Sequence, residues 1–314
     1  MRRIAVITPV SHLEGVLELL KTKGEVYLYE EATREEVRKL LLDKNIDTIF
    51  CNPNQQTYKL DKELLDGTVV DTINTASTGM NHIDQKYCHK VGIEVLSLTK
   101  DYKLIKQLPS TAELAFGLLL DLLRSISVSN KSVKEDLKWD YLPFVGHQLK
   151  DYPVGVVGFG RLGRMMYEYL VAFGAKVYVY DPYKQEEWDD SFLLNSACRS
   201  LEELFERSKA VSLHVHVTDE TKYMIDYKLA SKIDYIVNTS RGEIVVESDI
   251  VRALREGLLR GYAADVLEDE FEDITTSPLL ELENRKLNTI LTPHTGGMTI
   301  EGQTKAYTWA VNKL

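Results

Sequence analysis

Short runs of β-branched and other apolar residues alternate with amphipathic stretches along the whole chain of 314 residues. Strand-length and helix-length patterns that alternate in this way are typical of βα units built on a parallel sheet. The first third of the chain predicts helices at residues 12–23 and 34–43, the former closed by Gly24. It also predicts strands at residues 4–7, 26–29, 48–50, 69–74 and 93–96.

A second βα series occupies the rest of the chain, and an apolar helix joins it to the first. This helix is predicted to begin near Ser110, because Ser110 and Glu113 have the spacing of a capping box and Pro109 stops the preceding chain from being helical. Its apolar run, residues 114–123, is shorter than the ~18 residues of a membrane span, so we expect a buried helix. The strands of the second series are predicted at residues 154–157, 176–180, 211–215, 235–239, 261–265 and 289–291, before a last helix.

A glycine-rich turn connects the first strand of the second series to a helix predicted at residues 162–173. Gly158 permits a tight turn, Gly160 lets the backbone approach a pyrophosphate, and Gly163 lets the helix pack closely on the strand. The phosphates of a dinucleotide would bind at the amides and the positive dipole where this helix begins. The turn therefore predicts a dinucleotide site.

Asp181, at the end of the next strand, indicates which dinucleotide binds. A carboxylate at this place can accept both ribose hydroxyls of NAD, and it repels the 2′-phosphate of NADP. No arginine follows Asp181 closely, so NAD is favoured over NADP. The alternative is that the glycines only shape a helical turn and that Asp181 only caps the turn that follows.

Composition narrows the range of partners. A net charge of −10 and a pI near 5.3 argue against nucleic acid or an anionic membrane, and the first apolar run is interrupted too early for a signal peptide. Cys51, Cys88 and Cys198 form neither a disulfide framework nor a CxxC zinc site, so we expect a cytoplasmic protein. His214 and His216 share one face of a strand, but no third ligand stands at a suitable spacing, so we expect no metal site.

Three further side chains each follow an apolar, strand-like run. Arg241 can bind a carboxylate through its planar guanidinium, His294 can donate or accept a proton, and Glu270 can tune that histidine. A nicotinamide carries hydride but can neither hold nor protonate a 2-keto acid, so these residues supply what a dinucleotide site lacks. Each has a plainer alternative: a surface ion pair for Arg241, a solvated acidic loop for Glu270, and a loop histidine for His294.

The order of these motifs resembles that of the D-isomer-specific 2-hydroxyacid dehydrogenase family over nearly the whole chain. With the alternating pattern, the resemblance implies an α/β protein of two Rossmann-like or flavodoxin-like parallel-sheet domains with an inter-domain cleft. The substrate-binding domain would be discontinuous, residues 1–104 plus 294–314, and the NAD-binding Rossmann domain would span residues 105–293. The segments that carry the resemblance are residues 76–84, 111–113, 138–139, 158–163, 211–215, 238–243, 265–270 and 292–297.

The resemblance also implies a role for each site residue. Arg241 would clamp the substrate carboxylate, His294 would be the general acid in reduction and the base in oxidation, and Glu270 would hydrogen-bond the far ring nitrogen. Asp265 would face the nicotinamide carboxamide. Backbone amides around Thr78, Gly79 and Met80 would bind the other end of the substrate carboxylate. The implied cofactor-binding residues are Gly158, Gly160, Arg161, Leu162, Gly163, Asp181, His214, Thr239, Ser240, Asp265, Gly296 and Gly297.

The implied reaction is the NAD-dependent interconversion of a 2-keto acid and a D-2-hydroxy acid. The implied assembly is a homodimer formed through the helix near residues 111–128. The loop at residues 51–56 lacks the arginine that phosphoglycerate-using relatives need, so phosphoglycerate dehydrogenase activity is less favoured, and no appended regulatory domain is expected. His216 and Phe271 stand where the family usually has proline, and His82, in the substrate loop, has no assigned role.

Two other functions stay open at this point. A non-catalytic NAD-sensing protein could use the same fold, although the arginine, glutamate and histidine together favour an enzyme. A formate dehydrogenase-like enzyme is disfavoured, because such relatives have glutamine at the position of Glu270.

Overall fold

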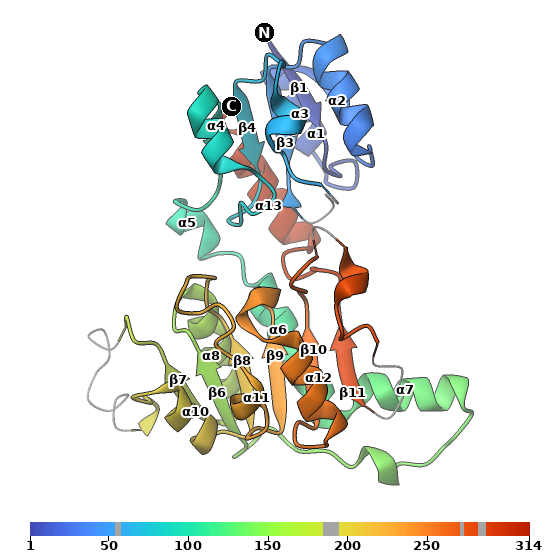
Figure 1. Cartoon of the computed structure of the whole chain (residues 1–314), viewed down its shortest axis with the longest axis vertical. Coiled ribbons are helices and arrows are strands. Elements are labelled where there is room, and N and C mark those ends of the chain that lie inside the picture. The colour runs from blue at the N-terminus through green and yellow to red at the C-terminus, as the bar shows by residue number, and fades with distance from the viewer. Residues whose placement is uncertain (54–57, 185–194, 271–272, 282–286) are drawn as a thin grey trace. The chain divides into compact units, whose positions relative to one another are not determined.

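The computed structural model describes residues 1–53, 58–184, 195–270, 273–281 and 287–314. The chain forms two compact α/β units: unit 1 comprises residues 1–108 and 297–314, and unit 2 comprises residues 109–296 (Figure 1). The chain thus leaves unit 1 once and returns to it with its last helix. None of the helices in these described ranges is long and apolar enough to cross a membrane.

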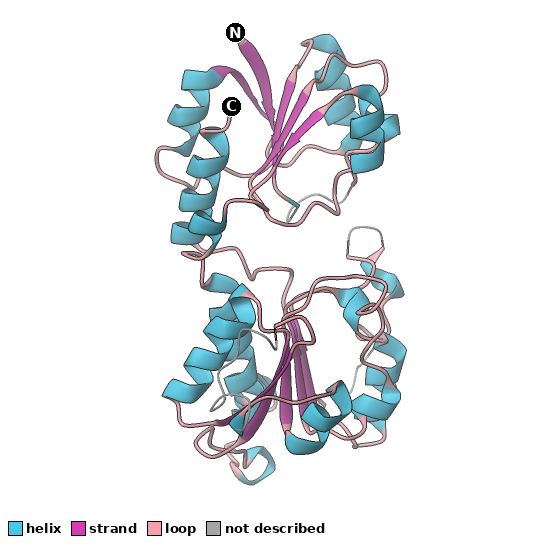
Figure 2. Ribbon diagram, turned by 90° about the vertical axis from the view of Figure 1, so that its left-hand side faces the viewer, coloured by secondary structure: helices cyan, strands magenta, loops and turns pink. Residues whose placement is uncertain are grey.

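Unit 1 is built on a parallel five-stranded sheet in the order β2-β1-β3-β4-β5 (Figure 2). This is a flavodoxin-like order, which reverses between β1 and β3. Helices α2, α3 and α4 pack on one face of the sheet, while α1 and α13 pack on the other. The elements are β1 (Arg2–Val6), α1 (Val16–Lys23), β2 (Gly24–Leu28), α2 (Arg34–Asp43), β3 (Thr48–Cys51), α3 (Lys62–Leu65), β4 (Thr72–Thr75), α4 (Gln85–Val91), β5 (Glu94–Leu96), α5 (Tyr102–Ile105) and α13 (Ile300–Val311).

The last helix, α13, completes the core of unit 1. Tyr307 is fully buried and lies edge-on against Phe50 with the ring centroids 5.7 Å apart, and its hydroxyl lies 3.2 Å from Thr8 Oγ1. Asn74 of β4 donates a 2.7 Å hydrogen bond from Nδ2 to the carbonyl of Ala310. The helix therefore belongs to the layer that covers this sheet, although all of unit 2 separates it in sequence from the rest of unit 1.

Unit 2 is built on a parallel six-stranded sheet in the order β11-β10-β9-β8-β6-β7. A short parallel bridge between Val179 and Ala197 continues the sheet beyond β7, which gives the strand order of a dinucleotide-binding fold, reversed between β6 and β8. The strands are β6 (Pro153–Val157), β7 (Lys176–Tyr180), β8 (Ala210–Leu213), β9 (Tyr235–Asn238), β10 (Gly261–Ala264) and β11 (Asn288–Leu291). The helices are α6 (Ser110–Arg124), α7 (Ile126–Glu135), α8 (Arg161–Ala172), α10 (Leu201–Arg207), α11 (Tyr227–Ala230) and α12 (Glu247–Arg255), with 3₁₀ turns η2 (Leu142–Phe144), η4 (Gly242–Ile244) and η5 (Ile274–Thr276).

The strands predicted from the sequence are all present, with ends that differ by a few residues, but the linking helix differs in two ways. The capping box predicted at Ser110 and Glu113 is wrong: Pro109 is the N-cap, no side chain caps the helix, and the amide of Glu113 bonds to the carbonyl of Pro109. The helix also ends at Arg124, because Ser125 adopts a left-handed conformation with φ of 52° before α7 begins. The apolar face of α6 packs into the core of unit 2.

We expect replacement of Tyr307 to show how much α13 contributes to unit 1. Tyr307→Ala should lower the free energy of unfolding by about 3–5 kcal/mol, because a large buried ring is lost. Tyr307→Phe should cost about 1 kcal/mol, because only the hydrogen bond to Thr8 is removed. Urea unfolding followed by circular dichroism measures both, and equal effects of the two variants would contradict the packing described.

Candidate active site

The glycine turn stands at the carboxyl end of β6, where the strand order of unit 2 reverses. Gly158 has φ of 88°, and a Cβ on Gly163 would lie 1.9 Å from the carbonyl oxygen of Gly158, so both positions need glycine. A Cβ on Gly160 would meet nothing within 4 Å, so open space lies beside the start of α8. No side chain caps this helix, and burial lowers the pKa of Arg161 in its first turn. An anionic pyrophosphate fits these features.

Asp181 connects the glycine turn to the end of β7. Its Oδ2 accepts a hydrogen bond from the backbone N–H of Phe159 at 2.7 Å, and its Oδ1 accepts one from the N–H of Tyr183 at 3.0 Å. The carboxylate thus stands at the end of the strand next to the turn, where a ribose would follow the phosphates.

Two residues that follow β8 and β9, His214 and Thr239, each have a buried polar atom without a hydrogen-bond partner in the described part of the chain. Burial lowers the pKa of His214 to about 4, so its ring is neutral; Ser212 Oγ lies 2.9 Å from Nε2. Among the described residues, nothing hydrogen-bonds the buried Nδ1 of His214 or the buried Oγ1 of Thr239. Buried polar atoms are usually satisfied, so these two fit the polar edge of a bound cofactor. Ser240, in contrast, donates to the carbonyl of Leu213 at 2.7 Å and joins the ends of β8 and β9.

Strands β9, β10 and β11 end at one level of the sheet, because Ala264 of β10 pairs with Asn238 of β9 and with Leu291 of β11. Arg241, Glu270 and His294 follow these three strands in that order. Since the carboxyl ends of parallel strands meet at one edge of a sheet, this register places the three segments along the same edge.

The carboxylate of Asp265, directly after β10, organises the segment that carries His294. It is buried, and it accepts hydrogen bonds from Thr292 Oγ1 at 2.5 Å, the N–H of Thr295 at 2.8 Å and the N–H of Gly296 at 2.7 Å. The backbone carbonyl of Asp265 also accepts the N–H of His294 at 2.9 Å. Sequence reasoning assigned Asp265 to the cofactor and missed this second role, because no local signal links Asp265 to residues 292–296, about thirty positions away.

Glu270 and His294 form the central contact of the site. Glu270 Oε1 lies 3.0 Å from His294 Nδ1, and both side chains are largely buried, with 12% and 21% of their surface exposed. His294 has φ of 53°, a conformation uncommon for a residue other than glycine, and its hydrogen bond to Asp265 helps to hold it. The carboxylate lies at Nδ1 and so fixes the orientation of the ring, which leaves Nε2 for the proton transfer.

Arg241 follows β9 and is partly buried. Its Nη1 donates a 2.6 Å hydrogen bond to the carbonyl of Ser240, and its own carbonyl accepts one from Asn238 Nδ2 at 2.9 Å. Asn238 thereby fixes the backbone turn that bears the arginine. Sequence reasoning quoted this asparagine but gave it no role.

The predicted substrate loop follows β4 in unit 1. Thr99 Oγ1 donates to the carbonyl of Thr78 at 3.0 Å, and Ser77 Oγ donates to that of Gly79 at 2.5 Å. Within the described ranges, the amides of Thr78, Gly79 and Met80 donate to no other group. They are therefore available to an anion. The two glycines after His294 that were assigned to the cofactor fall in different units: Gly296 ends unit 2, and Gly297 begins the part of the chain that returns to unit 1.

Other residues singled out in the sequence lie away from this chemistry or outside the described ranges. His82 is fully buried, with Nε2 3.1 Å from Thr75 Oγ1, beside Cys51, whose pKa burial raises to about 12. His216 is exposed on the loop after β8, and no three metal-binding side chains gather among the residues described. Phe271, and residues 54–56 of the loop examined for a phosphate-binding arginine, lie outside those residues.

Several known proteins are similar to this chain over most of its length. A family model described as the NAD-binding domain of D-isomer-specific 2-hydroxyacid dehydrogenases matches residues 116–296. A glyoxylate reductase from Thermofilum pendens is 31% identical over 96% of this chain and 87% of its own length. A D-3-phosphoglycerate dehydrogenase from Methanocaldococcus jannaschii is 30% identical over 100% of this chain but 57% of its own length.

A solved structure of a D-lactate dehydrogenase from Aquifex aeolicus, complexed with NAD and lactic acid, is similar with a TM-score of 0.77 and 27% identity, covering 99% of this chain and 94% of that one. The relatives and the solved structure each match nearly the whole chain, and the family model matches most of unit 2. The chain therefore belongs to the D-isomer-specific 2-hydroxyacid dehydrogenase family.

Proposed function

We propose that this protein is an NAD-dependent dehydrogenase that interconverts a 2-keto acid and a D-2-hydroxy acid. The observation that carries the proposal is the 3.0 Å contact between Glu270 and His294, at the sheet edge that also bears Arg241. The glycine turn for a dinucleotide belongs to the same unit. A protein that only sensed NAD would have no use for a buried acid–histidine pair beside an arginine.

Each side chain has a distinct task in reduction. The nicotinamide, when bound, supplies hydride to the carbonyl carbon. Arg241 binds the substrate carboxylate through its planar guanidinium. In unit 1, the amides of Thr78, Gly79 and Met80 are donors suited to an anionic group. His294 gives a proton from Nε2 to the carbonyl oxygen, and Glu270, at Nδ1, holds the ring in the orientation for that transfer. In oxidation, His294 takes the proton back.

The substrate class follows from the cations that the chain offers. Residues 51–56 include no arginine, so a phosphorylated substrate has no evident anchor there. The glyoxylate reductase and the D-lactate dehydrogenase similar to this chain are named for small 2-hydroxy or 2-keto acids without a phosphate. A small 2-keto acid with a neutral side chain is therefore the substrate proposed. Three free, buried cysteines fit a cytoplasmic enzyme.

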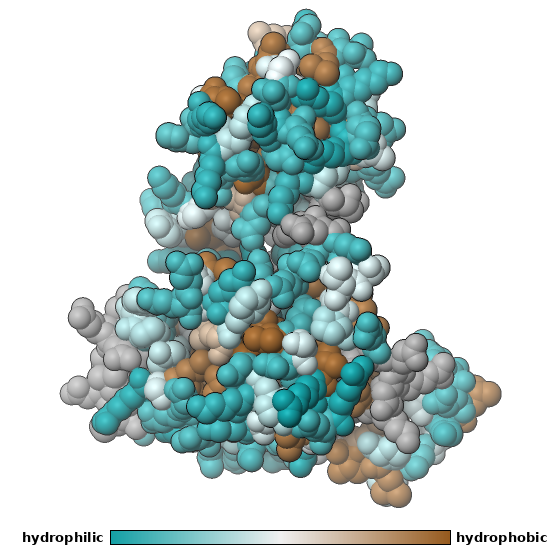
Figure 3. Space-filling model, in the orientation of Figure 1, coloured by the Kyte–Doolittle hydropathy of each residue, from teal (hydrophilic) through white to brown (hydrophobic). Residues whose placement is uncertain are grey.

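The assembly proposed is a homodimer formed through an exposed arm, residues 126–145. Most apolar side chains of α6 pack internally, so we place the interface after that helix and not on residues 111–124. Helix α7 buries no residue, and the chain that follows it exposes a row of apolar side chains (Figure 1, Figure 3). The exposed apolar residues of the arm are Ile126, Val133, Leu137, Trp139, Tyr141, Leu142 and Val145. Several large exposed apolar side chains on one segment are typical of a protein interface.

Replacing His294 should separate chemistry from cofactor binding. We expect His294→Ala to lower the rate of 2-keto acid reduction by about 10²–10⁴-fold, because the proton donor is lost, while NADH binds unchanged. NADH consumption with glyoxylate, pyruvate and hydroxypyruvate measures the rate, and NADH fluorescence measures binding. The exposed His89→Ala is the control. Normal turnover in His294→Ala would refute the assignment, and NADH binding without turnover in the wild type would favour a sensor.

Asp181 should decide the choice of cofactor. Asp181→Asn removes the negative charge but keeps an oxygen that can accept the N–H of Phe159, so the glycine turn should stay in place. We expect the preference for NADH over NADPH, measured as the ratio of kcat/KM values, to fall by about tenfold, which corresponds to ~1.4 kcal/mol. Asp43→Asn, the same change in unit 1, should leave the ratio unaltered. An unchanged ratio in Asp181→Asn would count against its role.

The arm should determine the oligomeric state. Trp139→Ser combined with Leu142→Ser removes two exposed apolar side chains of the arm, so we expect a dimer to become a monomer. Sedimentation velocity at micromolar concentration distinguishes the two states. Tyr102→Ser, an exposed aromatic position in unit 1, is the control. A monomeric wild type would rule the dimer out.

A further inference from the structure

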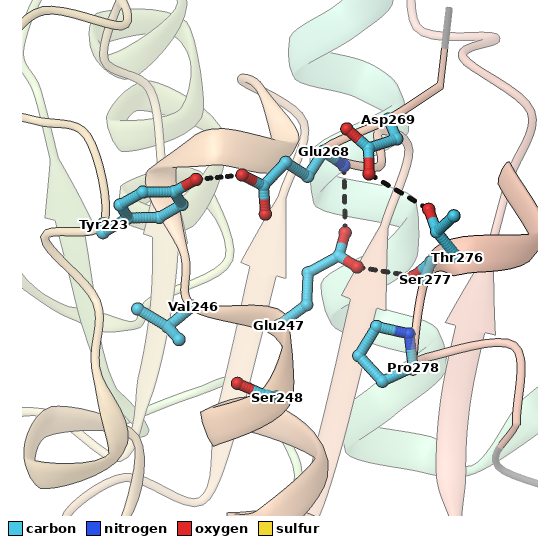
Figure 4. A pocket seen from close by; sticks show the side chains of 9 residues that line it. All are labelled: Tyr223, Val246, Glu247, Ser248, Glu268, Asp269, Thr276, Ser277 and Pro278. Atoms are coloured by element: carbon cyan, nitrogen blue, oxygen red, sulfur yellow. Dashed lines mark hydrogen bonds between the residues drawn. The ribbon is translucent and has the colours of Figure 1, made fainter. Parts of the chain in front are cut away.

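Glu270 stands between two described stretches of chain, residues 268–270 and 273–277, here together called loop 268–277, whose outer ends meet at one buried carboxylate. Glu247 Oε1 accepts the backbone N–H of Glu268 at 3.0 Å, and Glu247 Oε2 accepts the hydroxyl of Ser277 at 2.5 Å. Glu247 is only 5% exposed. Figure 4 shows both hydrogen bonds leaving the same carboxylate for opposite ends of the loop. One side chain therefore closes the base of the loop that carries Glu270.

Two more contacts hold the same loop. Thr276 Oγ1 donates to Asp269 Oδ2 at 3.0 Å, and the hydroxyl of Tyr223 donates to Glu268 Oε1 (Figure 4). Tyr223 has φ of 56°, a conformation that a bulky residue rarely adopts and that persists where the surroundings hold it. These contacts fix residues 268, 269 and 276 through side chains that take no part in the proposed chemistry.

The segment that bears Arg241 also supports this loop. Glu247 begins α12, soon after Arg241, and the 3₁₀ turn η4 lies between them. A Cβ on Gly242 would lie 2.1 Å from the backbone nitrogen of Glu268, so the loop rests directly on the residue that follows Arg241. Residues 241–247 therefore carry the arginine and contact the glutamate loop at both ends of the segment.

A carboxylate is a costly group to bury for stability alone. Burial raises the pKa of Glu247, the hydrogen bonds from Ser277 and Glu268 act in the opposite direction, and the negative charges of Glu268 and Asp269 raise it further. Replacing buried charged groups by well-packed apolar residues is often neutral or stabilising. What an apolar residue could not do is accept hydrogen bonds from two segments at once and so fix their separation.

We propose that Glu247 is a positioning residue for the reaction: it holds loop 268–277 so that the carboxylate of Glu270 stays within hydrogen-bond distance of His294. The inference rests on the proposed function, because Glu247 acts through Glu270, whose role in the reaction is itself proposed. Glu247 has no contact with substrate. Its effect on the reaction passes through Glu270. Loss of Glu247 therefore slows catalysis only in a protein that still has Glu270, because the slowing comes from displacement of Glu270.

A double-mutant cycle tests that dependence. In reduction of glyoxylate by NADH, we expect Glu247→Ala to lower kcat by about 10–100-fold, with the KM for NADH changed less than about twofold. Glu247→Gln, which keeps an acceptor for the amide of Glu268, should restore kcat to within about threefold of the wild type. In the Glu270→Ala background, adding Glu247→Ala should change kcat by less than about twofold. Equal losses in both backgrounds would overturn the proposal.

Asp249→Ala is the matched control. Asp249 stands on the same helix, and its Oδ2 accepts the backbone N–H of Tyr227 at 2.9 Å, so it too anchors a second segment, away from the Glu270 loop. We expect no loss of kcat in this variant. If Glu247→Ala does not fold, Ser277→Ala removes one of the two anchors and should lower kcat by about three- to tenfold. Equal losses of kcat in Asp249→Ala and Glu247→Ala would show general loosening and overturn the proposal.

Amide hydrogen exchange provides a readout that needs no turnover. We expect the amide of Glu268, which donates to Glu247, to exchange at least about tenfold faster in Glu247→Ala and to be unchanged in Asp249→Ala, because an amide exchanges when its hydrogen bond opens. Unchanged exchange in Glu247→Ala would overturn the proposal even if the enzyme uses none of glyoxylate, pyruvate and hydroxypyruvate. Absence of turnover by the wild type would instead count against the proposed function and leave the exchange result standing, so the two failures are distinguishable.

Discussion

The buried carboxylate of Asp265 is the interaction on which the site depends most. A charge buried in a protein is stable only when hydrogen bonds replace the water it has lost. Here the replacements are two backbone amides and two hydroxyls from residues 292–296, so the hydrogen-bonding requirement of one carboxylate determines the path of the segment after β11. His294 lies inside that segment, and its left-handed backbone is held on the same side by the carbonyl of Asp265. The position of His294 thus follows from the hydrogen bonds that the buried carboxylate of Asp265 receives.

Parallel pairing explains why residues so far apart in sequence can act together. Strands β9, β10 and β11 end in register, and each is followed by a segment that carries one member of the set Arg241, Glu270 and His294. The strands supply a rigid reference, and buried carboxylates then fix the loops that leave them: Asp265 holds one and Glu247 the other. Carboxylates recur in this role because one of them can accept hydrogen bonds from several amides at once.

Much of this arrangement was predictable from sequence, since the underlying signals are local. The strands are short β-branched runs, and the glycine turn combines φ requirements with close contacts that only glycine meets. The roles of Asp265 and Glu247 were not predictable, because each depends on the approach of a segment more than twenty residues away. The capping box at Ser110 failed for a local reason: Pro109 already provides the carbonyl that the first turn needs, so the helix begins one residue earlier than the motif implies.

The return of the chain to unit 1 has a consequence for biosynthesis. During vectorial synthesis the residues of unit 2 leave the ribosome as one continuous stretch, followed by α13. Domains generally fold as units as they emerge. Unit 2 can therefore reach its native state while the sheet of unit 1 still lacks Tyr307 over Phe50 and the contact of Asn74 with Ala310. The apolar face that α13 later covers is exposed throughout that interval, so the part of the protein made first is the part that needs protection from aggregation for longest.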